Sequence, residues 1–157
     1  MCHDSDFMKE AIKEAKKAAS IGEVPIGAVI VHEGLIVGRG YNRRENEQTT
    51  LSHAELYAIE EANKKVGSWR LEDCVLYVTL EPCAMCAGAI IQSRIKRVVY
   101  GAKDPKGGCV GSLMDLLQEK QFNHQVEWTS GILEESCKQL LQQFFKDLRK
   151  NKRKDYK

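Results

Sequence analysis

Two cysteines, Cys83 and Cys86, lie three residues apart directly after Pro82 in the stretch TLEPCAMCAG. Thiolates at this spacing on the first turn of a helix face the same way, and the positive end of the helix dipole favours their charged form. Zinc is commonly bound by such pairs, but a zinc ion takes four ligands. The pair therefore predicts half of a metal site, whose other ligands must come from elsewhere in the chain.

The predicted third ligand is His53, the first residue of the stretch HAE. One imidazole and two thiolates leave a tetrahedral zinc ion one position for water, which is typical of catalytic sites. Bound zinc lowers the pKa of water from about 15.7 towards ~7. Glu55 follows His53 by two residues and is placed to accept the proton of that water without binding the metal.

A closed structural zinc site is the alternative, with Cys109 or His124 as the fourth ligand. Such sites usually draw on a second closely spaced pair of ligands, and the sequence contains none. Glu55 on its own could simply favour a helix N-terminus. An RNA-binding module held together by zinc therefore remains open as a function of another class.

Composition places these residues in an ordinary globular chain of 157 residues, with 43% hydrophobic and 29% charged residues. No apolar run is long enough to cross a bilayer, and the N-terminal stretch MCHDSDFMKEAIKEAKKAA lacks the apolar segment of a secretory signal. We therefore expect a cytoplasmic protein with no membrane association, a single domain over residues 1–157, and six cysteines that remain thiols.

Hydrophobic periodicity and turn residues divide the chain into alternating helices and strands. The predicted helices span residues 6–20, 53–65, 82–93, 112–119 and 133–150. The predicted strands span residues 24–31, 34–41, 74–80, 97–101 and 125–131, of which the first two form a hairpin. This alternation indicates a layered α/β domain whose sheet is antiparallel at the hairpin and parallel where helices connect the strands.

Two of these helices begin where the chemistry is expected. Ser52 is predicted to cap the helix that starts near His53, and Pro82 is predicted to lie in the first turn of the helix that carries Cys83 and Cys86. Both helices follow strands, and ligands of such sheets collect where strand C-termini meet helix N-termini. The elements are thus expected to bring the three ligands together.

The end of the chain is strongly basic. Residues 146–157 hold seven basic and two acidic residues, a net charge of +5, which leaves −3 for the rest of a chain whose total is +2. A basic end can meet nucleic-acid phosphates, but Lys and Arg also stabilise the C-terminus of a helix. Charge alone leaves both interpretations open.

The pattern H-x-E followed by P-C-x-x-C matches the zinc deaminases. Beyond it, the stretches EVPIGAVIV, YNRRE, GSWRLEDCVLYVTLEPCAMCAGAIIQSRI, VVYGAKDPKGGCVGSLMDLL, FNHQVE and FFKDLRK resemble bacterial tRNA-specific adenosine deaminases over nearly the whole length. The resemblance implies a three-layer α/β/α cytidine-deaminase-like fold with a five-stranded mixed sheet. It also implies a homodimer with one Zn²⁺ per subunit that converts the wobble adenosine, position 34, of a tRNA anticodon stem-loop to inosine.

The resemblance also implies a role for individual residues. The implied zinc ligands and proton shuttle are His53, Cys83, Cys86 and Glu55. Asn42 would contact the purine and the backbone N–H of Ala54 would meet the C6 oxygen, although Asn42 by itself reads as a turn residue after a strand. The implied RNA-facing residues are Arg44, Asp104, Lys106, Phe145 and Arg149. Which of Phe144 and Phe145 faces RNA stays open, because one of two adjacent aromatic residues on a helix usually packs in the core.

A deaminase of a free base or nucleoside, such as guanine or cytosine, is the nearest rival, because the metal motif is shared by such enzymes. The stretch 103–108 and the basic segment FFKDLRK favour RNA, since a pocket for a small free base does not need them.

Overall fold

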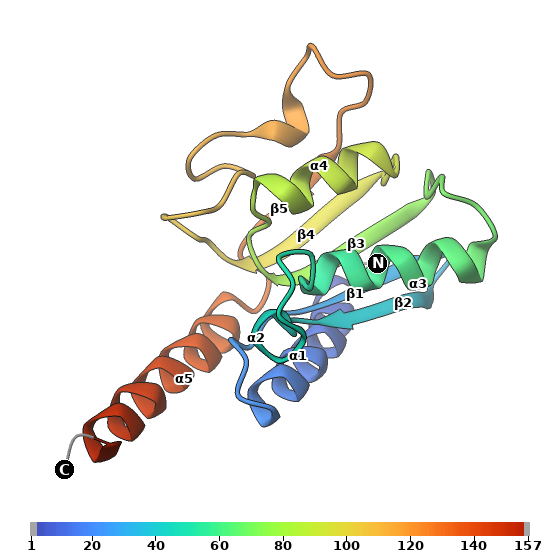
Figure 1. Ribbon diagram of the computed structural model, residues 1–157. Helices are drawn as coiled ribbons and strands as arrows, with labels where there is room; N and C mark the ends of the chain where they lie inside the picture. The colour runs from blue at the N-terminus through green and yellow to red at the C-terminus, as the bar shows by residue number, and fades with distance from the viewer. Residues whose placement is uncertain (1–2, 156–157) are drawn as a thin grey trace.

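A computed structural model describes residues 3–155 and places five strands and five α-helices in a layered domain (Figure 1). The helices are α1 (Asp4–Ser20), α2 (Arg44–Glu47), α3 (Ala54–Val66), α4 (Ala84–Gln92) and α5 (Glu134–Asp155), with a 3-10 turn η1 (Leu116–Gln118). The strands are β1 (Gly27–His32), β2 (Leu35–Tyr41), β3 (Cys74–Leu80), β4 (Arg97–Ala102) and β5 (Glu127–Thr129).

The sheet has the strand order β2-β1-β3-β4-β5. Strand β1 is antiparallel to both β2 and β3, whereas β3, β4 and β5 are parallel. Because the central strands are covered on both faces, they read as nearly continuous hydrophobic runs. On β1, Ala28 and Ile30 pack in the cluster under α3 and α4, while Val29 and Val31 pack under α1 and α5. The predicted three-layer fold with a five-stranded mixed sheet is confirmed.

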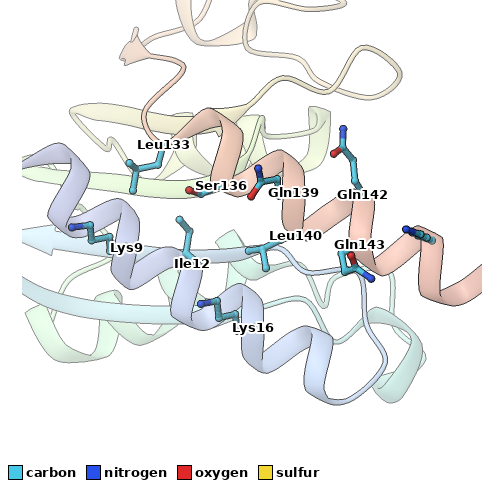
Figure 2. Close-up of a pocket in the computed structure, with 10 residues that line it drawn as sticks. Lys9, Ile12, Lys16, Leu133, Ser136, Gln139, Leu140, Gln142 and Gln143 are labelled. Carbon is cyan, nitrogen blue, oxygen red and sulfur yellow. The ribbon is translucent and has the colours of Figure 1, made fainter.

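Helix α5 lies beside α1 on one face of the sheet, and its C-terminal half extends beyond the sheet (Figure 1). A groove of about 750 Å³ runs between the two helices (Figure 2). Its lining residues are Lys9, Ile12, Lys16, Leu133, Ser136, Gln139, Leu140, Gln142, Gln143 and Lys146. The final residues of the predicted basic end, 156–157, lie outside the described part of the chain.

No helix within residues 3–155 combines the length and the apolar character needed to span a bilayer. The cysteines in this part of the chain are all free, whereas Cys2 lies outside it. The other predicted helices and strands are present, with ends that differ by a few residues.

The predicted helix at 112–119 is wrong, because long-range hydrogen bonds hold this segment in another conformation. The backbone N–H and the hydroxyl of Ser112 both donate to the carboxylate of Glu81. Asp115 forms an isolated antiparallel bridge with Val110, and its carboxylate accepts a hydrogen bond of 3.0 Å from the indole of Trp128. Only the 3-10 turn η1 remains of the expected helix.

The N-terminal ends of two helices also differ from the prediction. Helix α3 is capped by His53 and not by Ser52, whose hydroxyl donates to Glu47 and accepts from Tyr57. Pro82 precedes helix α4 and lies outside its first turn, because Cys83 is the capping residue. The metal-ligand candidates therefore stand at the helix ends themselves.

Candidate active site

The N-termini of α3 and α4 meet at one edge of the sheet and carry the predicted metal ligands. His53 caps α3 and Cys83 caps α4, both with extended backbone, and Cys86 is the third residue of α4. Gly40 on β2 lets α3 approach closely, since a Cβ there would lie 2.2 Å from the carbonyl oxygen of Ala54. A side chain at this position of β2 would push away the first turn of α3 and His53 with it.

The three candidate ligand atoms form one cluster. The Nδ1 atom of His53 lies 3.7 Å from the Sγ atom of Cys83 and 3.5 Å from that of Cys86, and all three atoms lie within 4.8 Å of one another. Tetrahedral zinc with ordinary Zn–N and Zn–S bond lengths would separate nitrogen from sulfur by about 3.6 Å. The donor set therefore fits a tetrahedral metal ion.

Neither candidate for a fourth protein ligand joins this cluster. The thiol of Cys109 is directed at the carbonyl of Gly107, at 3.7 Å. The Nε2 atom of His124 is hydrogen-bonded to the carbonyl oxygen of Ile95 at 2.8 Å. Within residues 3–152, whose side chains are described, the His, Cys and Cys trio is the only grouping of potential ligands at this spacing. The structure thus gives no support to a closed four-residue site.

The protons of the cluster are unequally shared between the two thiols. A hydrogen bond from Cys86, followed by one from His53, lowers the pKa of Cys83 to about 4. The hydrogen bond to Cys83, followed by burial, raises the pKa of Cys86. The hydrogen bond to Cys83 raises the pKa of His53. A metal ion binding here displaces protons from these groups, which couples its affinity to pH.

Glu55, the second residue of α3, lies at the base of the same site with only 4% of its surface exposed. Burial raises the pKa of its carboxyl group, and the charge of Cys83 acts in the same direction. A general acid or base works best when its pKa approaches the working pH. This carboxyl group is therefore suited to transfer protons at the metal trio.

A pocket of about 270 Å³ opens above these residues. It is lined by Val24, Ile26, Asn42, Arg44, His53, Ala54, Glu55, Leu80, Glu81, Cys83 and Asp104. This volume is near the lower end of small-ligand pockets, so it suits one nucleobase and excludes a folded RNA. The amide of Asn42 fixes the pocket wall, since it accepts from the N–H of Arg44 at 3.1 Å and donates to the carbonyl of Val24 at 3.2 Å.

The remaining predicted RNA-facing residues lie outside the pocket. Lys106 is exposed on the turn that begins at Asp104, and its backbone N–H donates to that carboxylate at 3.1 Å. Phe145 and Arg149 are exposed on α5, one helical turn apart, and so share a row on its surface. Phe144 is more buried than Phe145 and lines a cavity shared by α1 and α5, so Phe145 is the more accessible ring.

Sequence patterns missed two buried carboxylates, one that lines the pocket and one that holds the helix beginning at Arg44. Glu81 lines the pocket, and Glu23 precedes β1; each exposes no more than 2% of its surface. Burial alone would raise the pKa of each carboxyl group, but hydrogen bonds from neighbouring chain segments lower it by more. For Glu81, the one signal available from the sequence was its position as an acidic residue directly after the apolar run CVLYVTL.

Helix α2 was missed because its stabilising partner is distant in sequence. The carboxylate of Glu23 accepts the backbone N–H groups of Glu45 and Asn46 at 3.2 and 2.7 Å, and also the side-chain amide of Asn46. These groups lie in the first turn of α2 (Arg44–Glu47) and would otherwise lack partners. A carboxylate from another segment thus holds the single helical turn that begins at Arg44.

Comparisons with known proteins agree with this geometry. The MafB19-like deaminase family matches residues 2–149. A tRNA-specific adenosine deaminase from Bacillus subtilis (strain 168) is 60% identical over 153 residues, or 98% of this chain and 95% of that protein.

Two solved structures are also similar. One, from a study of A-to-I editing by tRNA:A34 deaminases at the wobble position of transfer RNA, has a TM-score of 0.83 and 42% identity, over 87% of this chain and 99% of that one. A guanine deaminase from Bacillus subtilis has a TM-score of 0.61 and 41% identity, over 66% of each chain.

Proposed function

Because the chain belongs to the family of tRNA-specific adenosine deaminases, we propose that it converts adenosine 34 of tRNA anticodon loops to inosine by hydrolytic deamination. The observation that carries this proposal is the His53, Cys83 and Cys86 trio with the buried carboxyl group of Glu55 beside it, at the base of a pocket for one base. The 157 residues act as one deaminase domain.

The trio would hold one Zn²⁺ per subunit, which when bound activates a water molecule for attack on C6 of adenine. Glu55 accepts a proton from that water and passes it to N1 of the ring. It then takes the proton of the new hydroxyl group on C6 and delivers it to the amino group, which leaves as ammonia. The oxygen of water thereby replaces the amino group. The backbone N–H of Ala54 donates to the new C6 oxygen, and Asn42 contacts the purine from the pocket wall.

Binding of the anticodon stem-loop would involve charged and aromatic residues outside the catalytic trio. Arg44 and Asp104 lie at the pocket, and Lys106 is on the adjoining turn. Phe145 and Arg149 extend the surface along α5, where a ring can stack on an unpaired base and a cation can meet a phosphate. The enzyme acts in the cytoplasm as a homodimer.

Deamination of free guanine is the second candidate, favoured by the similarity to a solved guanine deaminase. A pocket of about 270 Å³ accepts a free base as readily as one extruded from RNA. The exposed residues on α5 favour RNA, because a free base is too small to contact both them and the pocket.

A comparison of substrates, each incubated separately with the protein, tests the assignment. Purified protein is incubated with an anticodon stem-loop carrying adenosine 34 and, in parallel, with free adenosine, cytidine and guanine, and products are identified by mass spectrometry. We expect inosine in the stem-loop alone. Ammonia released only from a free base would exclude the tRNA assignment, and a stem-loop with guanosine at position 34 serves as the unreactive control.

A further inference from the structure

Glu81 is a buried carboxylate that receives four hydrogen bonds from the loop following β4. Its Oε1 atom accepts the backbone N–H of Asp104 at 3.1 Å and the hydroxyl of Ser112. Its Oε2 atom accepts the backbone N–H groups of Val110 and Ser112, each at 3.0 Å. An ionised carboxylate accepts hydrogen bonds and donates none, so it can satisfy all four of these N–H and O–H donors.

The same loop and the end of β4 are joined to residues 81–82, directly before the candidate ligand Cys83. The backbone N–H of Glu81 donates to the carbonyl of Ala102 at 2.9 Å, and that of Cys109 donates to the carbonyl of Pro82 at 2.9 Å. Gly108 leaves room for the carboxylate, because a Cβ there would lie 2.2 Å from the Cδ atom of Glu81. Glu81 therefore stands where the loop and the segment before Cys83 meet.

Asp104 is the one member of this loop that both lines the pocket and is held by Glu81. Its own carboxylate accepts the backbone N–H groups of Lys106 and Gly107 at 3.1 Å each, which folds the turn that carries Lys106. Any displacement of the Asp104 backbone therefore moves the Asp104 side chain in the pocket and the adjoining turn that carries Lys106.

We propose that Glu81 is a positioning residue, which fixes Asp104 at the pocket mouth relative to the metal trio and thereby sets how the substrate RNA is held. The inference rests on the proposed function and adds to it a residue, Glu81, whose side chain affects the substrate only by holding Asp104 in place. Loss of such a residue affects the placement of the substrate while the metal ligands stay in place.

Replacement of Glu81 by glutamine separates these contacts, because the amide has one oxygen and one nitrogen. With its oxygen towards Val110 and Ser112, the amide keeps two backbone hydrogen bonds, and the Ser112 hydroxyl can rotate to accept from its nitrogen. The N–H of Asp104 then faces another donor. The opposite orientation loses two backbone hydrogen bonds, so Glu81→Gln selectively releases Asp104.

Amide hydrogen exchange followed by NMR tests this release without any substrate. In the zinc-loaded wild type, the Asp104 amide should be protected although it lies in a loop; free exchange there would overturn the proposal without any variant. In Glu81→Gln we expect its exchange to rise at least about tenfold, while the Val110 and Ser112 amides stay protected. Unchanged exchange at Asp104 would also overturn it.

Two control variants separate positioning from general destabilisation. Glu23→Gln makes the same change at an equally buried carboxylate, which holds α2 and has no hydrogen bond to Asp104, and should leave Asp104 protected. Ser112→Ala removes one donor to Glu81 but leaves the bond to Asp104, and should also leave it protected. Equal loss of Asp104 protection in all three variants would indicate a merely structural role and contradict the proposal.

Kinetics with the adenosine 34 stem-loop then test the consequence. Glu81→Gln should lower kcat/KM about 10-fold to 100-fold with full zinc content, and should have little further effect in an Asp104→Ala background. Additive losses would contradict action through Asp104. A wild type that is inactive on the stem-loop would refute the proposed function, whereas the exchange result would still decide whether Glu81 holds Asp104.

Discussion

At the scale of single residues, the candidate site combines three potential metal ligands, His53, Cys83 and Cys86, with carboxylates that are buried in the surrounding chain. A metal restricts its ligands to a few residue types, so the spacing of Cys83 and Cys86 and the stretch HAE indicate their function directly. Glu23 and Glu81 bind groups that are 22 to 31 residues away in the sequence. Their role depends on the tertiary fold, which no local pattern contains.

The hydrogen bonds to Glu23 predict a pH dependence of stability. They hold the pKa of this carboxyl group below its ordinary value of 4.5 despite burial. Its contribution is therefore present above about pH 4.5 and is lost as the pH falls through the lower pKa of the folded state. We expect Glu23→Gln to reduce the free energy of unfolding by about 1–3 kcal/mol at pH 7, and by much less at pH 3.

Urea denaturation at the two pH values measures this difference. Glu61→Gln, an exposed change on α3, provides the control and should alter the stability by less than about 0.5 kcal/mol at either pH. A loss in Glu23→Gln that is the same at pH 3 and pH 7 would show that its charge has no part in holding α2.

At the scale of elements, the periodic segments were predicted correctly, whereas the segments fixed by distant partners were not. Helices α1, α3, α4 and α5 show their apolar spacing in the sequence. The failures at 112–119 and at α2 share one cause, because their conformations depend on hydrogen bonds to Glu81 and Glu23. Intrinsic propensity is a weak guide when tertiary contacts satisfy the backbone.

A pair of glycine substitutions tests how closely α3 must approach β2. Gly40→Ala places a Cβ 2.2 Å from the carbonyl oxygen of Ala54, so we expect a loss of about 1–3 kcal/mol in stability and weaker zinc binding, because His53 moves with α3. Gly88 lies within α4, and a Cβ added there would have open space around it. Gly88→Ala should therefore raise the free energy of unfolding by about 0.5–1 kcal/mol.

Urea denaturation and competition with a zinc chelator measure both effects in parallel. Equal zinc affinity in Gly40→Ala and the wild type would show that the packing of α3 on β2 does not set the position of His53.

At the scale of the whole molecule, the fold brings His53, Cys83 and Cys86 together where α3 and α4 begin. Helix α5 extends outward from the sheet (Figure 1) and exposes basic residues and the ring of Phe145. The layered α/β class could be predicted because alternating helices and strands have few ways to pack, whereas the five-stranded three-layer arrangement was implied by the resemblance to the deaminases. Sequence did not reveal how far α5 extends beyond the sheet, since periodicity gives a helix its face and not its direction in space.

The arrangement of α5 predicts a salt-dependent binding of RNA. Binding of a stem-loop with guanosine 34 should weaken as salt rises, and Arg149→Ala should reduce the slope of log Kd against log salt concentration by about 0.7–1. Phe145→Ala should weaken binding by about 1–3 kcal/mol with an unchanged slope, because stacking releases no counterions. Fluorescence anisotropy over a series of salt concentrations measures both, and a flat response in the wild type would remove α5 from the binding surface.

The deamination chemistry itself can be followed by mass spectrometry in H₂¹⁸O, with zinc content and thermal unfolding measured on the same samples. The wild type should convert adenosine 34 to inosine with a mass gain of about 3 Da, since the new oxygen comes from water. Glu55→Ala should keep its zinc and its fold but react about 10²–10⁴ times more slowly. A zinc-loaded Glu55→Ala that reacts as fast as the wild type, or a product without heavy oxygen, would contradict hydrolytic deamination by this site.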